Sequence, residues 1–271
     1  METSNSSNLK INTKETAGLL FTCIIFVLVS VLLSGAVANY SSQIFSEAGL
    51  KSLMVFIRVV HILSGIGCLT FGMGAMLSAK GGKRHRLFGK IYFWCMLIIF
   101  VTSIPMTIYT KNIFFFFIGF LSFYPAMAGY RVLFQKKLTQ GQKPTWYDYL
   151  IMASTFITML VGYYIAIRNL KENTDIGIIL LVLCSTGILS VVRNFIRYRK
   201  PPVHKSFWLL VHIGEMSASY IAACTAFLVN NSRYFPSINQ ILLWTSPAII
   251  GGILIAITLR KQRKKLGMVK G

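Results

Sequence analysis

Long apolar segments recur along the whole chain, and they constrain its fold more than any other feature. A helix needs about 20 mostly apolar residues to cross the hydrocarbon core of a bilayer. Segments of that kind occupy residues 17–38, 53–78, 88–110, 113–134, 149–167, 176–198, 207–229 and 239–260. The connections are short, and the residue alternation of membrane β-strands is missing. We therefore expect an all-α polytopic membrane helix bundle of about eight spans, which forms one integral membrane domain over residues 1–271.

The charge of the chain is concentrated in the loops between these segments. There are 28 Lys and Arg against 7 Asp and Glu, a net charge of +21, although 55% of the residues are hydrophobic. If the N-terminus is cytoplasmic, all but six basic residues fall on the cytoplasmic side, which is the positive-inside pattern. The six exceptions are Lys51, Arg58, Lys111, Arg168, Lys171 and Arg233. We therefore expect both termini in the cytoplasm, and we expect no nucleic-acid binding because the basic residues are not interleaved with polar surface.

The first segment has a second interpretation. Ala36-Val37-Ala38 resembles a signal-peptidase site, but the apolar region before it is longer than the core of a signal peptide, which runs about 7–15 residues. We expect an uncleaved span. All five cysteines lie inside the apolar segments without metal-binding spacing, and we expect them to pack as small apolar residues. They are Cys23, Cys68, Cys95, Cys184 and Cys224.

The two halves of the chain share a short pattern. His85 and His204 each begin a His-basic-x-Phe sequence at the predicted cytoplasmic start of a span. A duplication of four helices, followed by four in the same direction, would produce this pair. The four-plus-four parallel repeat is a hypothesis only, because the rest of the two halves aligns poorly and weak symmetry arises easily among apolar helices.

Ionisable residues inside two spans mark a candidate site. Arg58 and His61 share one face of the second segment, and His212 and Glu215 share one face of the seventh. Small residues continue both faces, so we expect both helices to be interior and paired. Ionisable groups in a bilayer are costly and are a functional hypothesis by default. In a proton-linked mechanism Glu215 and His212 exchange the proton, and Arg58 fixes an anionic group near His61.

Two intramembrane histidines also fit a b-type haem with axial imidazoles. His61 and His212 are the candidate ligands, and a quinone or a lipid is the alternative ligand of the site. A rise of 1.5 Å per residue places these histidines roughly 10 Å apart in depth, which argues against one shared haem. A structural interpretation stays open, in which Arg58 extends toward water and Glu215 clamps two helices without chemistry.

A second polar group lies at the predicted cytoplasmic mouth. His85 and Tyr92 share a stripe of the third segment, Arg86 follows His85, and His204 precedes the seventh segment. These residues predict a site for a lipid phosphate or a small anionic substrate, since helix N-termini favour negative charge. The alternative is a solvated belt of topology-setting charges. The same two interpretations, anionic-lipid binding and topology anchor, apply to the basic run at residues 260–265.

Residues 85–92 read HRLFGKIY. Together with His61 and the glycine-rich span that follows it, they resemble a family of bacterial predicted membrane proteins of unknown function, which carries a His-Arg-x-x-Gly-Arg/Lys-x-Tyr signature. Residues 208–230 are similar to a subset of that family, with His212 among the similar positions. The resemblance implies a multi-pass protein of the bacterial inner membrane and brings no established activity with it. It draws attention to His61, His85 and His212 without naming their chemistry.

The chain lacks the motifs of hydrolases, nucleotide-binding proteins and metalloproteases. We therefore expect a multi-pass membrane protein with a polar His/Glu/Arg site that serves a redox or proton-linked role. The alternative is a non-catalytic membrane scaffold, or a small-molecule transporter, whose buried polar residues are structural. The expected partners are the lipid bilayer and anionic lipids at its cytoplasmic face.

Overall fold

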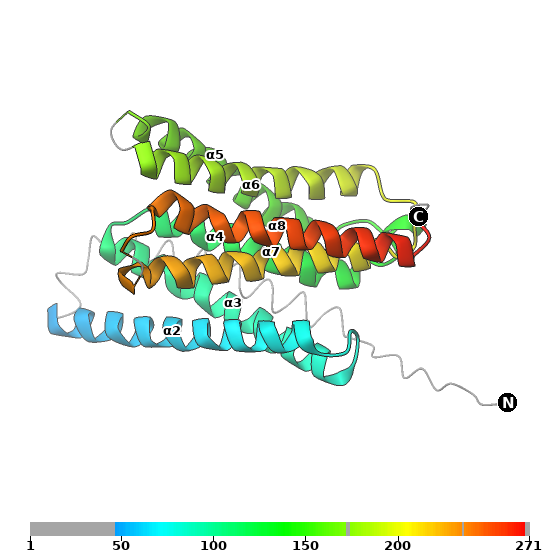
Figure 1. Cartoon of the computed structure of the whole chain (residues 1–271), viewed down its shortest axis with the longest axis horizontal. Helices are drawn as coiled ribbons and strands as arrows, with labels where there is room; N and C mark the ends of the chain where they lie inside the picture. Colours follow the sequence, from blue (N-terminus) through cyan, green and yellow to red (C-terminus); the bar gives the residue numbers. More distant parts are fainter. Residues whose placement is uncertain (1–46, 172–173, 235, 269–271) are drawn as a thin grey trace.

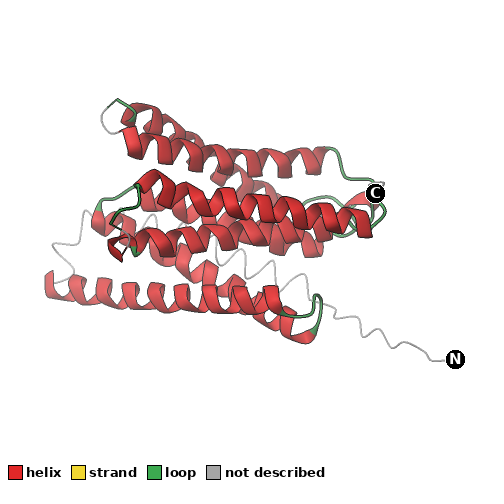
Figure 2. Ribbon diagram, in the orientation of Figure 1, coloured by secondary structure: helices red, strands yellow, loops and turns green. Residues whose placement is uncertain are grey.

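The protein is a bundle of long helices that run side by side (Figures 1 and 2). The structure is a computed structural model and describes residues 47–171, 174–234 and 236–268. Within these residues there is no strand, and seven helices are long and apolar enough to cross a membrane. The all-helical membrane fold is therefore confirmed. The predicted first span, residues 17–38, lies outside the described residues.

Each predicted span from the second to the eighth coincides with one long helix. The helices are α2 (Glu47–Leu77), α3 (Lys83–Thr110), α4 (Phe114–Arg131), α5 (Trp146–Asn169), α6 (Thr174–Arg199), α7 (Phe207–Asn230) and α8 (Gln240–Lys265). Short 3-10 helices cover Val132–Phe134, Leu138–Gln140 and Ser232–Tyr234. α5 begins at Trp146, before the predicted start of its span, because Thr145 and Asp148 form a capping box. α8 continues to Lys265, so the basic run at its end is helical.

One end of the bundle carries the basic loops, and we name it the basic end. It is formed by residues 78–82, 132–145 and 200–206 and by the last turns of α8, whose end is marked C in Figure 1. This is the end that the positive-inside pattern predicts to face the cytoplasm. The orientation itself stays a prediction, as do the count of eight spans, the four-plus-four repeat and the single domain.

Helix α4 lies at the centre of the described bundle. It contacts α3, α5, α6 and α7, and nearly every residue of its second half is buried. The sequence predicts that α2 and α7 are both interior. α7 does pack between α4, α8 and α2, but α2 packs chiefly against α3 and lies at one edge of the described helices (Figure 1). The reason is that α2 exposes a wide apolar face, including Phe56, Ile62 and Ile66, which suits contact with lipid.

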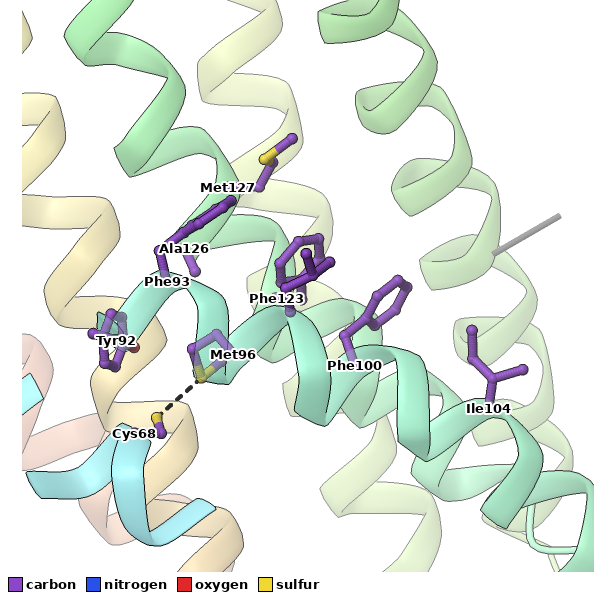
Figure 3. Packing of buried hydrophobic residues seen from close by; sticks show 10 residues of the cluster. Cys68, Tyr92, Phe93, Met96, Phe100, Ile104, Phe123, Ala126 and Met127 are labelled. Carbon is purple, nitrogen blue, oxygen red and sulfur yellow. Dashed lines mark hydrogen bonds between the residues drawn. The ribbon is translucent and has the colours of Figure 1, made fainter. Parts of the chain in front are cut away.

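The largest buried cluster joins α2, α3 and α4 (Figure 3). The rings of Phe100 and Phe123 stack with centroids 4.8 Å apart and planes 9° apart. Cys68 donates its thiol hydrogen to Met96 Sδ at 3.2 Å, so its sulfur is part of the packing. The four cysteines of the described residues are free, in keeping with the expected packing role.

A buried ion pair holds α4 to the start of α5. The Arg131 guanidinium donates from Nε to Asp148 Oδ1 at 2.8 Å and from Nη2 to Oδ2 at 3.0 Å. Asp148 Oδ2 also accepts from the backbone and the hydroxyl of Thr145, at 2.8 and 2.6 Å. The Arg131 guanidinium lies 4.6 Å from the centre of the Tyr147 ring. The carboxylate thus binds the arginine with both oxygens and caps α5 with Oδ2.

We predict that Asp148→Asn lowers the free energy of unfolding by about 3–5 kcal/mol, because it leaves the buried Arg131 without a carboxylate. Thermal unfolding of the purified protein in detergent measures the effect. Asp175→Asn is the control, since Asp175 is exposed, and it should change the melting temperature little. Equal stability of the two variants would show that the Arg131–Asp148 pair contributes nothing net.

Helices α4 and α7 approach each other closely at Gly129. A Cβ added there would lie 2.9 Å from Met216 Cγ and 3.0 Å from the Met216 backbone nitrogen. Only glycine permits this distance, because the backbone of α7 cannot move aside as a flexible side chain would. The close approach also brings the Gly129 carbonyl within 2.8 Å of His212 Nδ1.

We predict that Gly129→Ala destabilises the protein by about 1–3 kcal/mol, since the added methyl group must push α4 away from α7. Gly65→Ala is a matched control on α2, where a Cβ would meet no atom within 4 Å. That variant should be as stable as the parent or slightly more stable, because alanine favours helix over glycine. The melting temperatures of both variants are measured in the same detergent. That of Gly129→Ala should fall, and that of Gly65→Ala should stay the same or rise.

Candidate functional site

Two histidines that are far apart in the sequence come together near the basic end. His85, in the first turn of α3, and His212, in the second turn of α7, have ring centres 6.2 Å apart, with the ring planes at 76°. His85 Nδ1 lies 2.9 Å from the carbonyl oxygen of Ala75, and His212 Nδ1 lies 2.8 Å from that of Gly129. Four helices, α2, α3, α4 and α7, therefore meet at this histidine pair.

The two carbonyls decide which nitrogen of each ring carries hydrogen. A carbonyl oxygen can only accept, so each Nδ1 must donate to it. In the neutral rings the lone pairs then lie on Nε2, and no hydrogen bond within the described residues occupies either Nε2. Ala75 and Gly129 both lie in the last turn of their helices, where backbone carbonyls have no partner further along the helix. The histidines therefore satisfy two carbonyls that the helices leave open.

Basic residues surround the histidine pair. Lys80 Nζ donates to the carbonyls of Met76 and Ala75, and so caps α2 beside His85. Lys136 Nζ lies 4.3 Å from the centre of the Trp208 ring, and both lysines are close enough to act electrostatically on His212. The nearby groups on neighbouring elements are thus predominantly cationic, which favours an anionic ligand at this end of the bundle.

Glu215 lies one turn deeper on α7 and points toward α6. It is 9% exposed, and its Oε2 accepts from Ser190 Oγ at 3.2 Å. No hydrogen bond in the described part of the chain joins the Glu215 and His212 side chains, so the predicted proton exchange between them stays a prediction. The sequence places the two on one helical face, but His212 contacts α3 and α4 whereas Glu215 contacts α6.

Helix α6 presents a polar stripe to Glu215. Ser190, Asn194 and Arg197, at spacings of four and three residues, are all buried. Asn194 Nδ2 donates to the Tyr124 hydroxyl at 2.9 Å. Asn194 Oδ1 and the Nε and Nη2 atoms of Arg197 are buried without a hydrogen-bond partner. Arg197 acts electrostatically on Glu215, although no salt bridge within the described residues joins the two. Buried polar groups are rarely left unpaired, so this stripe is a candidate functional region.

A chain of hydroxyl groups links α3, α7 and α4 next to these residues. The Tyr92 hydroxyl donates to Ser219 Oγ at 2.8 Å, and Ser219 Oγ donates to the Ser122 carbonyl at 2.9 Å. Tyr92 is 2% exposed and Ser219 is fully buried. Tyr92, which the sequence predicts as a ligand-binding residue, is therefore engaged in an interhelical hydrogen bond.

The other predicted site residues lie away from the histidine pair. His61 Nδ1 is 2.8 Å from Thr102 Oγ1, between α2 and α3, and Arg58 is exposed on α2. Ala75, which contacts His85, follows His61 by fourteen residues, or about 21 Å of helix. The structure thus separates His61 from His212 and brings His85 to His212 instead.

Arg86 lies in the first turn of α3, next to the basic end, and His204 lies in one of the loops of that end. Arg86 is exposed and donates from Nη1 to the Gly81 carbonyl at 3.1 Å. His204 Nδ1 accepts from the backbone nitrogen of Ser206 at 3.1 Å, which shapes the turn before α7. The site for a lipid phosphate or a small anionic substrate, predicted from His85, Arg86, Tyr92 and His204, stays a prediction.

A cavity of about 710 Å³ lies at the opposite end of the bundle, among α4, α5, α6 and α8. Phe117, Asp175 and Trp244 are among its lining residues, and the ring of Trp244 packs edge-on against that of Phe114 at 5.0 Å. The sequence analysis did not single out this region. Its lining residues come from four separate stretches of the chain, so no local pattern could have indicated it.

The sequence of the chain matches one family of membrane proteins. The sequence model of the predicted membrane protein family DUF2306 matches residues 58–196, which is more than half of the chain. The chain belongs to this family. The DUF2306 region runs from Arg58 in α2 to Ile196 in α6 and includes His61, His85, Arg86 and Tyr92. It ends before α7, so His204, His212 and Glu215 lie outside it.

The family assignment describes a membrane protein and names no activity. No curated protein and no solved structure gives a match to the chain. Within the DUF2306 region, the signature at residues 85–92 and the bacterial origin stay predictions.

Sequence reasoning did not identify the partners of Glu215 on α6. Asn194 and Arg197 lie near the basic end of their span, where basic residues are expected to set the topology. Their spacing from Ser190 was the available signal: three polar residues at i, i+4 and i+7 in an apolar helix predict one polar face. Asp148 was likewise missed, although it is one of only 7 acidic residues.

We predict that Ser219→Ala destabilises the protein more than Tyr92→Phe does. Ser219→Ala leaves the buried Tyr92 hydroxyl without an acceptor, at a cost of about 1–3 kcal/mol, whereas Tyr92→Phe leaves Ser219 bonded to the Ser122 carbonyl. The double variant should be less destabilised than the sum of the two single variants. Thermal unfolding of all three tests this order, and additive effects would argue against the hydroxyl chain.

Proposed function

We propose that this protein is an integral membrane protein in which Glu215 takes up and releases a proton as part of a redox or proton-linked cycle. The observation that supports it most is the environment of the carboxyl group. Glu215 is buried in a membrane helix beside an arginine whose Nε and Nη2 have no hydrogen-bond partner. A purely structural clamp would be expected to satisfy those groups with each other.

The surroundings of Glu215 suit both protonation states. Removal of a carboxylate from water is costly, which favours the neutral acid. Ser190 donates to the carboxyl group, and Arg193 and Arg197 act on it electrostatically, which favours the anion. Burial thus opposes the three α6 residues that favour the anion. A modest change in the position of those residues can therefore shift the balance between the neutral acid and the anion. Such a group can bind a proton in one step of a cycle and release it in another.

The histidine pair and the basic loops are a candidate binding site for an anionic ligand. Cationic residues near His85 and His212 suit an anionic group of a substrate or of a lipid headgroup, with Arg86 and His204 at the edge of the region. Arg58 and His61 would belong to a separate polar site, about 21 Å of helix away. The alternative function, a scaffold or transporter with structural polar residues, predicts that Glu215 does not titrate.

We predict that Glu215 gives a titrating carbonyl band in infrared difference spectra of the protein in lipid nanodiscs, recorded from about pH 5 to about pH 9. The band belongs to a protonated carboxyl group that is shielded from water. Glu215→Gln should remove it while keeping a side chain that can hydrogen-bond to Ser190. With only 7 acidic residues in the chain, the assignment is tractable.

Asp175→Asn is the matched control because it removes an exposed carboxyl group of the same protein. Its spectra should keep the titrating band. The proposal is wrong if the parent protein shows no protonated-carboxyl band that changes with pH, or if the band survives in Glu215→Gln. Melting temperatures of both variants exclude unfolding as the cause of a lost band.

A further inference from the structure

We propose that His85 and His212 are the two axial ligands of one haem iron at the basic end of the bundle. The inference is independent of the proton-binding role of Glu215, and it assigns the histidine pair to haem in place of an anionic substrate or lipid headgroup. It rests on the ring geometry, on the hydrogen bonds that fix each ring, on the number of ligands available and on the charge around them.

The hydrogen bonds prepare both rings as ligands. Each Nδ1 donates to a backbone carbonyl, of Ala75 or of Gly129, so each neutral ring has its lone pair on Nε2. Metal-bound histidines in proteins commonly donate their other ring N–H to a carbonyl in this way, which fixes the tautomer and raises the basicity of the ligand. Here both members of the pair have this arrangement.

The separation of the rings fits one metal atom between them. With metal–nitrogen bonds of about 2 Å, two imidazoles on opposite sides of one ion have ring centres roughly 6 Å apart. The observed separation is 6.2 Å. A direct hydrogen bond between the two Nε2 atoms would need a hydrogen that neither neutral tautomer carries there. The geometry thus favours a shared electron-pair acceptor over a ring-to-ring hydrogen bond.

The number of ligands favours haem over a bare ion. Within the described residues no group of three or more His, Cys, Asp or Glu side chains could hold a metal ion. Structural zinc sites take four protein ligands and catalytic ones take three. A haem iron receives four nitrogens from the porphyrin, so two axial imidazoles complete its coordination.

Charge and space point the same way. Lys80 and Lys136 act electrostatically on His212, which opposes a bare divalent cation but suits the two carboxylates of a haem. Gly89 follows His85 by one turn on the same face of α3, and a Cβ there would meet no atom within 4 Å. The absence of a side chain leaves room beside the His85 ring for the edge of a flat group.

Absorption spectra of the full chain test the proposal. The protein is purified in mild detergent from haem-replete cells, or reconstituted with haemin, and spectra are recorded before and after dithionite. We expect about one haem per chain, with the sharp reduced bands of a low-spin, six-coordinate iron. Because the ring planes lie at 76°, the oxidised protein should give the strongly anisotropic electron paramagnetic resonance signal of near-perpendicular axial imidazoles.

The four histidines of the chain supply matched controls. His85→Ala and His212→Ala should each lose the low-spin spectrum and reduce the haem bound per chain roughly tenfold or more. His61→Ala and His204→Ala should keep both. Added imidazole should restore the low-spin spectrum of His85→Ala, which separates loss of a ligand from loss of the fold.

Three outcomes would overturn the proposal. The first is protein that stays free of haem in haem-replete cells and does not take up haemin, while its melting temperature shows that it is folded. The second is a haem spectrum that is unchanged in both His85→Ala and His212→Ala. The third is stoichiometric copper or zinc, found by elemental analysis and lost in the same two variants, because that would assign the pair to a bare ion.

Discussion

The arrangement of the polar residues depends on the close approach of α4 and α7 at Gly129. A glycine in α4 lets the backbone of α7 come within van der Waals distance at Met216, and this contact sets the height and rotation of α7. His212 and Ser219 then reach backbone carbonyls of α4, and Glu215 reaches Ser190 of α6, each at a different depth. Without the contact, none of these side chains would reach its partner on α4 or α6.

The bilayer explains why the interior can hold so many polar groups. Lipid provides no hydrogen-bond partners, so each polar side chain in a span must find one on another helix or on its own backbone. The described helices meet this demand mostly with single bonds between neighbours, such as Asn194 to Tyr124 and Tyr92 to Ser219. Thr107 Oγ1, Asn194 Oδ1 and two nitrogens of Arg197 are the exceptions among the described residues, and Arg197 acts electrostatically on Glu215, a carboxyl group that α7 holds away from its ends.

The sequence predicted the helices well and their neighbours poorly. Spans two to eight follow from apolar length alone, and the capping box at Thr145 accounts for the early start of α5. Which helices contact each other could not be deduced from apolar length. Lipid and a neighbouring helix are equally apolar, so an apolar face does not indicate which helix covers it. Thus the glycines of α2 indicated an interior helix, whereas α2 lies at the edge of the described bundle. Likewise, His85 and His204 looked equivalent in sequence, but only His85 lies beside His212.

The two carbonyls that accept hydrogen bonds from the histidine rings belong to helix ends. Ala75 and Gly129 lie at the C-terminal ends of α2 and α4, where the helix dipoles place partial negative charge. These backbone dipoles do not titrate, and the Nδ1 hydrogen that each carbonyl accepts is present in the neutral and in the protonated ring alike. The tautomer of both imidazoles is therefore set by the backbone of α2 and α4.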